Sequence, residues 1–324
     1  MQVSDLHIKF KLSLALTIFV TTFLSAQLSR THYIPPITAA ANSNATPQNQ
    51  YLHISTPSIT PVDVEVNDLG NVISNYTVSN ANPLEIYVGF GDNTSFVIPS
   101  SNIESEISNK GFIIQSEKPV YVSVRLVAGN QNQAGSLVSK GLSGLGNVFR
   151  IGTFTNLKNF TSSNQDFINF VSVMATENNT QIDFSDLPSD IVIENSIPLM
   201  GVLNAGESKI IALNPAITPS NRDGLIGALV TSNKPIIVNC GSINGSNSNG
   251  NGRDAGIDQI ADTSEGMVAS PYTDLGDSNN RYAAYVYKRP QSGTAFPHDN
   301  HGNRDLWPNG VKYPRVNSVV TKPS

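Results

Sequence analysis

The stretch SEKPVYV at residues 116–122 recurs 116 residues later as SNKPIIV at residues 232–238. Each copy has a Lys-Pro step followed by an apolar triplet. Because proline has no backbone N–H to donate to a sheet ladder, we expect Pro119 and Pro235 each to open a strand or a turn, and the apolar triplet that follows to enter a core. We expect Lys118 and Lys234 to be solvated charges at strand edges, where they oppose strand-on-strand aggregation.

A second group of residues repeats in the same order, 120 positions apart. The two sets are Thr56, Thr60, Val62, Asp63 and Val64, and then Thr176, Thr180, Ile182, Asp183 and Phe184. Each set combines an extended strand, a polar turn and a second strand. Two markers in one order indicate a duplicated β unit.

Short β-branched runs separated by Asn, Gly, Pro and Ser fill the chain between residues 32 and 259, which is typical of a sandwich or barrel. The predicted strands are residues 51–55, 62–66, 84–90, 112–115, 120–127, 167–174, 181–184, 209–213, 225–231 and 236–239. Only residues 101–108 predict a short helical turn, with Ser101 as its cap. We predict an all-β chain of two tandem related antiparallel β-sandwich-like units with long Asn/Gly-rich loops, followed by an irregular C-terminal tail.

Charged residues make up only 14% of the 324 residues, and the formal net charge is −5. Disordered chains are rich in charge and poor in β-branched residues, whereas this chain places Asn, Ser, Thr and Gly between many Val and Ile. The 20 Lys and Arg residues are spread thinly, so the sequence lacks the basic patch that binds nucleic acid. Composition therefore argues against disorder and against a nucleic-acid partner.

The single cysteine, Cys240, excludes an intramolecular disulfide, and the motifs CxxC, HExxH, GxSxG and GxxxxGK[ST] do not occur. Cys240 follows the predicted strand 236–239, and free cysteine is among the most buried residue types. We therefore interpret it as a packing residue rather than a nucleophile. With no arrangement of nucleophile, base and acid, we predict that the chain is not an enzyme and needs no cofactor.

The N-terminus has the pattern of a secretory signal peptide. Residues 8–11 (IKFK) carry positive charge, and residues 12–24 (LSLALTIFVTTFL) form a mostly apolar run shorter than the roughly 20 residues that span a bilayer. We expect residues 1–26 to be removed and the protein to be secreted or displayed on the extracellular cell surface, with no later membrane span. The predicted domains are a first β unit at residues 27–150, a second at residues 151–260 and an unassigned tail at residues 261–324.

A loop rich in small polar residues is expected after each Lys-Pro strand, at residues 128–146 and 241–256. Loops on a rigid scaffold often carry binding residues, although plain surface connections are the alternative. The binding-loop candidates are Asn130, Asn132, Asn247, Asn249, Asn251, Arg253 and Asp254. Asn251, Asp254 and Asp258 offer oxygen ligands for calcium, but their spacing matches neither an EF-hand nor a nonapeptide repeat.

The tail offers two further candidate sites. His298 and His301 flank Asp299 in the sequence HDNH, a set that can ligate zinc or copper, with a polar turn as the alternative. Trp307 and nearby tyrosines offer a sugar-stacking surface or core packing. One alternative function is therefore a metal-dependent hydrolase that uses the tail histidines.

Several motifs resemble one known family. They are HYIPP at residues 32–36, QYL at 50–52 with STP at 55–57, GSL at 135–137 with SKG at 139–141, VMATENNT at 173–180 and GRDAGIDQ at 252–259. Over about residues 32–260 the chain resembles the IgGFc-binding protein N-terminal domain, in the version of secreted Bacteroidota proteins. The resemblance implies an extracellular β-rich module, often within surface proteins that carry a gliding-motility-associated sorting domain. The family's name comes from mucus proteins associated with immunoglobulin Fc, and transferring that ligand to this chain is an analogy.

From these observations we expect a non-enzymatic module for adhesion or for recognition of proteins or glycans through its Asn/Gly-rich loops. Two structural alternatives remain, a spacer or a truncated fragment of a larger surface or gliding-motility-associated protein. The family pattern continues beyond Gln259 with more strands, whereas residues 261–324 contain no sorting domain that we recognise and one strand pattern, residues 281–288.

Overall fold

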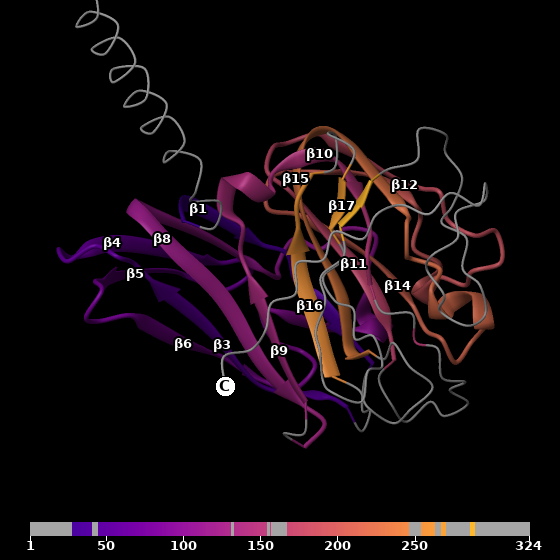
Figure 1. Ribbon diagram of the computed structural model, residues 1–324, viewed down its shortest axis with the longest axis horizontal. Coiled ribbons are helices and arrows are strands. Elements are labelled where there is room, and N and C mark those ends of the chain that lie inside the picture. Colours follow the sequence, from indigo (N-terminus) through magenta and orange to yellow (C-terminus); the bar gives the residue numbers. More distant parts are fainter. Residues whose placement is uncertain are drawn as a thin grey trace, which may run out of the picture.

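The computed structural model describes residues 28–40, 45–130, 133–153, 156, 167–245 and 254–262, and the backbone of residues 267–269 and 286–288. Two seven-stranded antiparallel sheets follow one another along the chain (Figure 1). The helical segments among the described residues are four 3-10 turns: η1 (Ser100–Asn102), η2 (Gly141–Gly144), η3 (Glu194–Ser196) and η4 (Pro219–Arg222). The structure confirms the predicted all-β class with two related units.

The first unit is built around the 17-residue strand β8 (Phe112–Ala128). Its sheet has the order β5-β4-β8-β3-β6, and β1 and β9 also pair with β8. The bounds of the other strands are β1 (Ser29–Ile34), β3 (Pro47–Ser55), β4 (Val62–Asp68), β5 (Ile73–Val78), β6 (Leu84–Phe90) and β9 (Gln133–Val138).

The second unit repeats this plan around the 17-residue strand β15 (Leu229–Gly245). Its sheet has the order β13-β12-β15-β11-β14, and β10 and β16 also pair with β15. The bounds of the other strands are β10 (Gly146–Arg150), β11 (Asn169–Ala175), β12 (Thr180–Ser185), β13 (Met200–Leu203), β14 (Ser208–Leu213) and β16 (Asp254–Ile260).

Each Lys-Pro step lies inside a long strand, so the prediction that proline opens a strand or a turn was wrong. The first part of β8 pairs with β4 as far as Ser116, and the later part pairs with β3 from Tyr121 onward. Pro119 lies between these partners, so its missing N–H removes no ladder bond. The same change of partner surrounds Pro235, between Ser232 beside β12 and Ile236 beside β11.

Two segments that the sequence predicted as loops contain parts of strands. Strand β9 lies within residues 128–146, and residues 241–256 contain the end of β15 and the start of β16. Small residues there allow close backbone contact rather than a loop. A Cβ atom on Gly241 would lie 2.1 Å from the carbonyl oxygen of Gly256, and one on Gly135 would lie 2.9 Å from Ala255 Cβ.

The segment predicted to start a helix at Ser101 forms only the 3-10 turn η1, whose side chains make no capping hydrogen bond. Further along, Ile107 exchanges two backbone hydrogen bonds with Ser208 of β14. Pairing with the second unit's sheet thus replaces the helical hydrogen bonds that the cap would have started.

The first unit also contributes a parallel two-stranded ladder, β2 (Ile37–Ala39) with β7 (Val97–Pro99). Every residue of this ladder is buried. Strand β2 contacts β11, β14 and β15 of the second unit, and one hydrophobic cluster includes residues of both units. The first unit therefore covers one side of the second unit's sheet.

The last described elements are the short strands β17 (Met267–Ala269) and β18 (Val286–Lys288), which pair in antiparallel fashion. Within the described parts of the chain, no helix is long and apolar enough to cross a membrane. The predicted signal peptide and the tail residues His298 and His301 lie outside the described residues.

Candidate binding site

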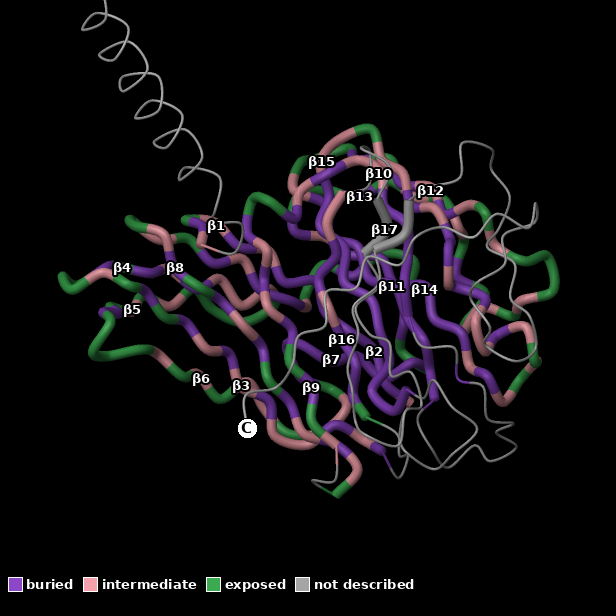
Figure 2. Tube along the Cα trace, viewed as in Figure 1, coloured by how far each residue is buried: buried purple, intermediate pink, exposed green. Residues whose placement is uncertain are grey.

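The sheet formed by β6, β3, β8 and β9 buries one side and presents the other to solvent. Along β3 and β8, burial alternates with period two, so Leu52 and Val124 are fully buried while their neighbours point outward. Figure 2 shows this alternation, and it contrasts with β11 and β14, which are buried throughout. We call the outward surface the open face; it comprises Asn49, Tyr51, His53, Glu85, Tyr87, Tyr121, Ser123, Arg125 and Ser136.

Tyr51 is the centre of the open face. It is in register with Arg125 on one side and with Tyr87 on the other. The ring centroids of Tyr51 and Tyr87 are 5.5 Å apart with an interplanar angle of 56°, and the ring of His53 lies 6.3 Å from that of Tyr51. Tyr87 is 55% exposed and Tyr121 is 42% exposed, so aromatic surface is presented to solvent by rigid strands.

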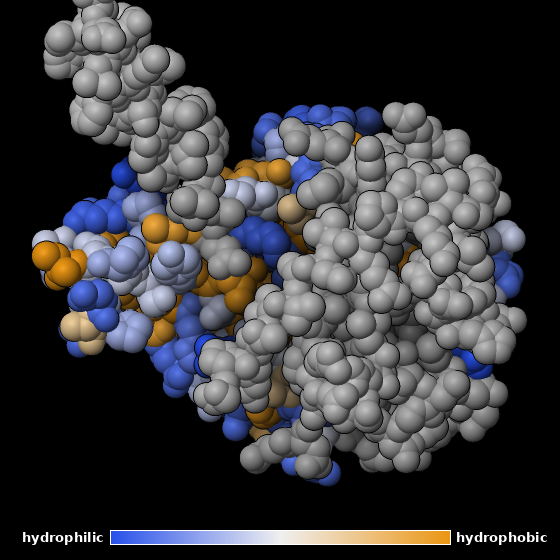
Figure 3. Space-filling model, in the orientation of Figure 1, coloured by the Kyte–Doolittle hydropathy of each residue, from blue (hydrophilic) through white to orange (hydrophobic). Residues whose placement is uncertain are grey.

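Polar groups surround these rings. His53 Nδ1 lies 3.6 Å from Glu85 Oε2, and the hydroxyl of Tyr87 donates a hydrogen bond to Asn49 Oδ1 at 3.4 Å. The visible surface of the first unit mixes hydrophilic and hydrophobic residues (Figure 3). This mixture of aromatic, charged and amide groups is typical of protein recognition surfaces.

Two grooves of about 360 Å³ each flank Arg125 on the open face. One passes from Tyr51 across Ser136 of β9 to Ile257 of β16, so it continues onto the second unit. The other is lined by His53 and Tyr121 among others. The guanidinium of Arg125 is thus available to both grooves.

The counterpart sheet of the second unit, β14-β11-β15-β16, has no such open side among its described residues. Positions can be matched by counting from the proline of each long strand, because Arg125 and Gly241 each lie six residues after theirs. Tyr51 pairs with Arg125, and Phe170 pairs with Gly241. Phe170 is therefore the register equivalent of Tyr51, and it is fully buried.

The remaining register equivalents follow the same rule. Solvent-facing residues of the first unit correspond to buried residues of the second in the pairs His53 and Ser172, Glu85 and Ile210, Tyr87 and Ala212, Tyr121 and Ile237, and Ser123 and Asn239. The same sheet surface is therefore exposed to solvent in the first unit and buried in the second unit.

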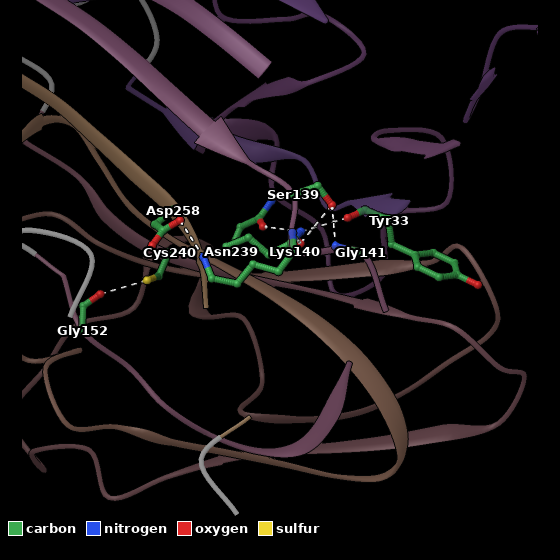
Figure 4. Close-up of polar contacts among 9 residues, drawn as sticks. Tyr33, Ser139, Lys140, Gly141, Gly152, Asn239, Cys240 and Asp258 are labelled. Atoms are coloured by element: carbon green, nitrogen blue, oxygen red, sulfur yellow. Dashed lines mark hydrogen bonds and ion pairs between the residues drawn. The ribbon is translucent and has the colours of Figure 1, made fainter. Parts of the chain in front are cut away.

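The two units meet where β9 and the residues after it run beside β16. We call these contacts of residues 133–141 with residues 254–259 the joint. Gln133 Nε2 donates to Asn244 Oδ1 beside it, and the backbone N–H of Ala134 donates to Asp254 Oδ1 at 2.9 Å. At the other end, Lys140 Nζ lies 3.1 Å from Asp258 Oδ1 (Figure 4). Polar contacts thus hold both ends of the joint.

Several segments that carried the family resemblance meet at the joint. His32, Ser139, Lys140, Asp258 and Gln259 come from three separate motifs and lie in one hydrogen-bonded group. Burial raises the pKa of Asp258, and its ion pair with Lys140 opposes that shift. The resemblance therefore includes residues that hold the two units together.

The structure describes only part of the predicted binding-loop set. Asn130 is exposed with φ of 55°, and Asp254 Oδ1 accepts the backbone N–H groups of Ala134 and Ala255. Asn132, Asn247, Asn249, Asn251 and Arg253 lie outside the described residues.

The two described candidates for metal binding are Asp254 and Asp258. The carboxylates of Asp254 and Asp258 each accept hydrogen bonds from protein donors. In the described segments, no three His, Cys, Asp or Glu residues gather in a group that could hold a metal ion. Asp254 and Asp258 are therefore engaged in linking the two units.

Cys240 is fully buried, and its thiol donates to the carbonyl of Gly152 at 2.9 Å. Burial, followed by the negative charge of Asp258, raises the pKa of this thiol far above its ordinary value. A thiol that stays protonated is a poor nucleophile. The interpretation of Cys240 as a packing residue is confirmed.

The comparisons with known proteins give one match. Residues 134–267 match the family model described as IgGFc binding protein. No curated protein and no solved structure matches the chain. The matched segment begins in β9 and includes every strand of the second unit, so it supports the family resemblance there. The description names a binding protein and no enzymatic reaction.

Proposed function

We propose that this chain is a non-enzymatic extracellular binding module whose open face recognises a protein ligand. The proposal rests on the contrast between the register-equivalent sheet surfaces of the two units. The surface of the second unit is covered by apolar packing, whereas the open face of the first unit presents tyrosines and an arginine to solvent. A surface that only packed against a permanent neighbour would have the Phe, Ile and Ala residues of the second unit. The open face instead has the residue types that dominate binding energy at protein interfaces.

The geometry favours a protein over a glycan as the ligand. The open face is a sheet surface spanning four strands, with two shallow grooves on either side of Arg125. Tyrosine supplies large contact area at low entropic cost, and arginine reaches acidic side chains or backbone carbonyls of a partner. The family description names immunoglobulin Fc, which makes the Fc fragment the first probe to test.

The finer elements of this proposal come from the sequence. We propose secretion through the signal peptide at residues 1–26 and a role in adhesion at the cell surface. The resemblance to secreted Bacteroidota proteins with gliding-motility-associated sorting domains supports a setting on a bacterial envelope.

Binding of the purified chain to an immobilised panel tests the proposal. The panel holds immunoglobulin Fc fragment, deglycosylated mucin and protein-free bacterial surface glycans. We expect micromolar or tighter binding to a protein probe, weakened at least about tenfold by Tyr51→Ala with Tyr87→Ala, because truncating interface aromatics removes hot-spot energy. Arg125→Glu should also weaken binding.

The matched control is Gln181→Ala with Met200→Ala, at a groove of about 550 Å³ on β12 and β13 of the second unit. This variant should bind as the parent does. Binding to the glycans alone would contradict the protein assignment, and no binding to any probe would contradict the proposed function. Equal losses in both double variants would show that the open face is not the site.

A further inference from the structure

A chain of buried hydrogen bonds crosses the joint from His32 to the second unit. His32 Nδ1 lies 3.0 Å from Ser139 Oγ, and Ser139 Oγ lies 3.1 Å from Gln259 Oε1. The backbone N–H of Gly141 also donates to Ser139 Oγ, at 3.2 Å (Figure 4). His32, Ser139 and Gln259 are all 0% exposed, so bulk water does not complete their hydrogen bonding. The protons available to this network can therefore be counted from the residues alone.

The partners of Gln259 fix the orientation of its amide. Its oxygen accepts the backbone N–H of Lys140 at 2.7 Å, and its nitrogen donates to the carbonyl of Tyr33 at 2.9 Å. A flipped amide would place two donors together and two acceptors together. The nitrogen of Gln259 also donates to Asn239 Oδ1 at 3.2 Å, and Asn239 donates in turn to the carbonyl of Pro35 at 2.8 Å. Gln259 Oε1 can therefore only accept a proton from Ser139.

The second ring nitrogen of His32 faces acceptors only. His32 Nε2 lies 3.0 Å from the carbonyl oxygen of Val120 and 3.2 Å from that of Ser29. Because a carbonyl has no proton to give, Nε2 carries a hydrogen in either charge state. The charge state of His32 is therefore decided at Nδ1, beside Ser139.

The Ser139 hydroxyl has one proton and two acceptors competing for it. If His32 is neutral, Nδ1 has a lone pair and accepts a hydrogen bond from the Ser139 hydroxyl, which leaves Gln259 Oε1 without a hydrogen bond from Ser139. If His32 is protonated, Nδ1 donates to Ser139 Oγ, and the hydroxyl is free to donate to Gln259. The hydrogen bond from Ser139 to Gln259 thus requires the imidazolium, whereas the other bonds between the units do not.

We propose that His32 is an acid-sensitive switch at the joint, in which protonation of the imidazole turns the Ser139 hydroxyl from His32 to Gln259 of the second unit. The second unit supplies an internal reference. Phe149 pairs with Val230 as His32 pairs with Ile114, and both partners lie five residues before their prolines. Phe149 is fully buried as well. In the second unit, an apolar ring therefore fills the position equivalent to His32, and no proton-dependent contact is made there. The proposed switch does not depend on the proposed function.

Burial lowers the pKa of His32 below its ordinary value, while the hydrogen bonds to Val120 and Ser29 oppose this shift. The ring of Tyr33 points away from the joint (Figure 4). The charged groups on the elements packed around His32 are the exposed Arg30 on β1, the exposed Glu117, Lys118 and Arg125 on β8, the half-buried Lys234 on β15, and the paired Lys140 and Asp258. The folded chain thus binds this proton less readily than the unfolded chain. Its unfolding free energy should fall as pH drops below about 6.5.

NMR of the full chain with ¹⁵N-labelled histidine and glutamine tests the switch between about pH 7.5 and about pH 4.5, a range that brackets the ordinary histidine pKa. We expect His32 to hold the Nε2–H tautomer at the upper end and to gain a proton at Nδ1 with a midpoint below about 6.5. The side-chain amide signal of Gln259 should shift with the same midpoint.

Two variants separate a switch from a merely structural histidine. In Ser139→Ala, His32 should still titrate while the Gln259 shift is lost, because the shared hydroxyl is missing. In His32→Phe, which copies the second unit, the Gln259 shift should also be lost. The proposal is overturned if His32 keeps one protonation state across the range, or if it titrates without a response at Gln259. A Gln259 response that survives in Ser139→Ala also overturns it, even where His32→Phe does not fold.

Discussion

The β6-β3-β8-β9 sheet and the β14-β11-β15-β16 sheet share strand order and pairing, yet they differ in what covers their outer sides. Tyr51 and Phe170 show the difference at one register position, since the first contributes to a solvent-exposed groove and the second is fully buried. The ladder of β2 and β7 accounts for it, because β2 contacts β11, β14 and β15. A segment of the first unit thus turns the second unit's sheet into an inner layer.

The difference teaches how a duplicated scaffold can divide its tasks. A sheet covered on both sides needs near-continuous apolar residues, and a sheet with one free side alternates buried with polar residues. Strand β11 of the second unit is buried throughout, as expected for a sheet covered on both sides. Strand β3 of the first unit alternates buried and more exposed residues, as expected for a sheet with one free side. The second unit's sheet is therefore an inner layer, and the first unit's sheet keeps a solvent-exposed side.

The largest expected effect comes from truncating the two equivalent aromatic residues. Phe170→Ala should lower the unfolding free energy by about 3 to 5 kcal/mol, because a fully buried ring leaves a cavity. Tyr51→Ala should cost no more than about 1 kcal/mol, the scale of a cross-strand aromatic pair. Urea unfolding followed by circular dichroism measures both. Similar costs for the two variants would break the comparison.

An intermediate effect is expected at the equivalent polar pair Asn239 and Ser123. Asn239→Ala removes the partner of both Gln259 and the Pro35 carbonyl inside the covered layer, so it should cost about 1 to 3 kcal/mol. Ser123→Ala on the open face should change stability by less than about 0.5 kcal/mol. The same urea unfolding assay measures both variants. If Ser123→Ala lowers the unfolding free energy as much as Asn239→Ala does, Ser123 does not lie on a solvent-exposed face.

The smallest effect should be of similar size in the two units. Thr56 Oγ1 donates to the carbonyl of Pro119 at 3.1 Å, and Thr176 Oγ1 donates to that of Pro235 at 2.7 Å. Thr56→Val and Thr176→Val should each cost about 1 kcal/mol, because each loses the hydrogen bond to a proline carbonyl. Thr56→Val also loses the longer bond that Thr56 Oγ1 accepts from the backbone N–H of Ser58 at 3.2 Å, so its cost should be slightly the larger. Clearly unequal losses would show that the two threonines are not equivalent.

The duplication and the strand content were predictable from the sequence because they rest on local patterns. The Lys-Pro step marks the point where β8 and β15 each change their pairing partner. The strand predicted at residues 84–90 has the bounds of β6. The continuity of the long strands was not predictable, because it depends on Pro119 lying between two different partners. That information is tertiary, and no local rule contains it.

The open face could not be predicted from the sequence for a related reason. Tyr51 and His53 alternate with buried residues at period two, as do Tyr121 and Arg125, so the sequence indicates that each set shares one side of a strand. It does not indicate which sheet remains uncovered, since β2 of the first unit packs against β11, β14 and β15 of the second unit. The composition of residues 128–146 predicted an Asn/Gly-rich binding loop. In the structure, Gly135 of β9 in this segment allows close packing against Ala255 of β16.

Tyrosine-specific chemical modification with mass spectrometry tests the central claim most directly. The free chain and the chain saturated with the Fc fragment or mucin, whichever binds, are labelled in parallel. We predict that labelling of Tyr51, Tyr87 and Tyr121 falls on binding, while Tyr76 on β5 is unchanged. Unchanged labelling of the three open-face tyrosines in the bound chain would contradict the account.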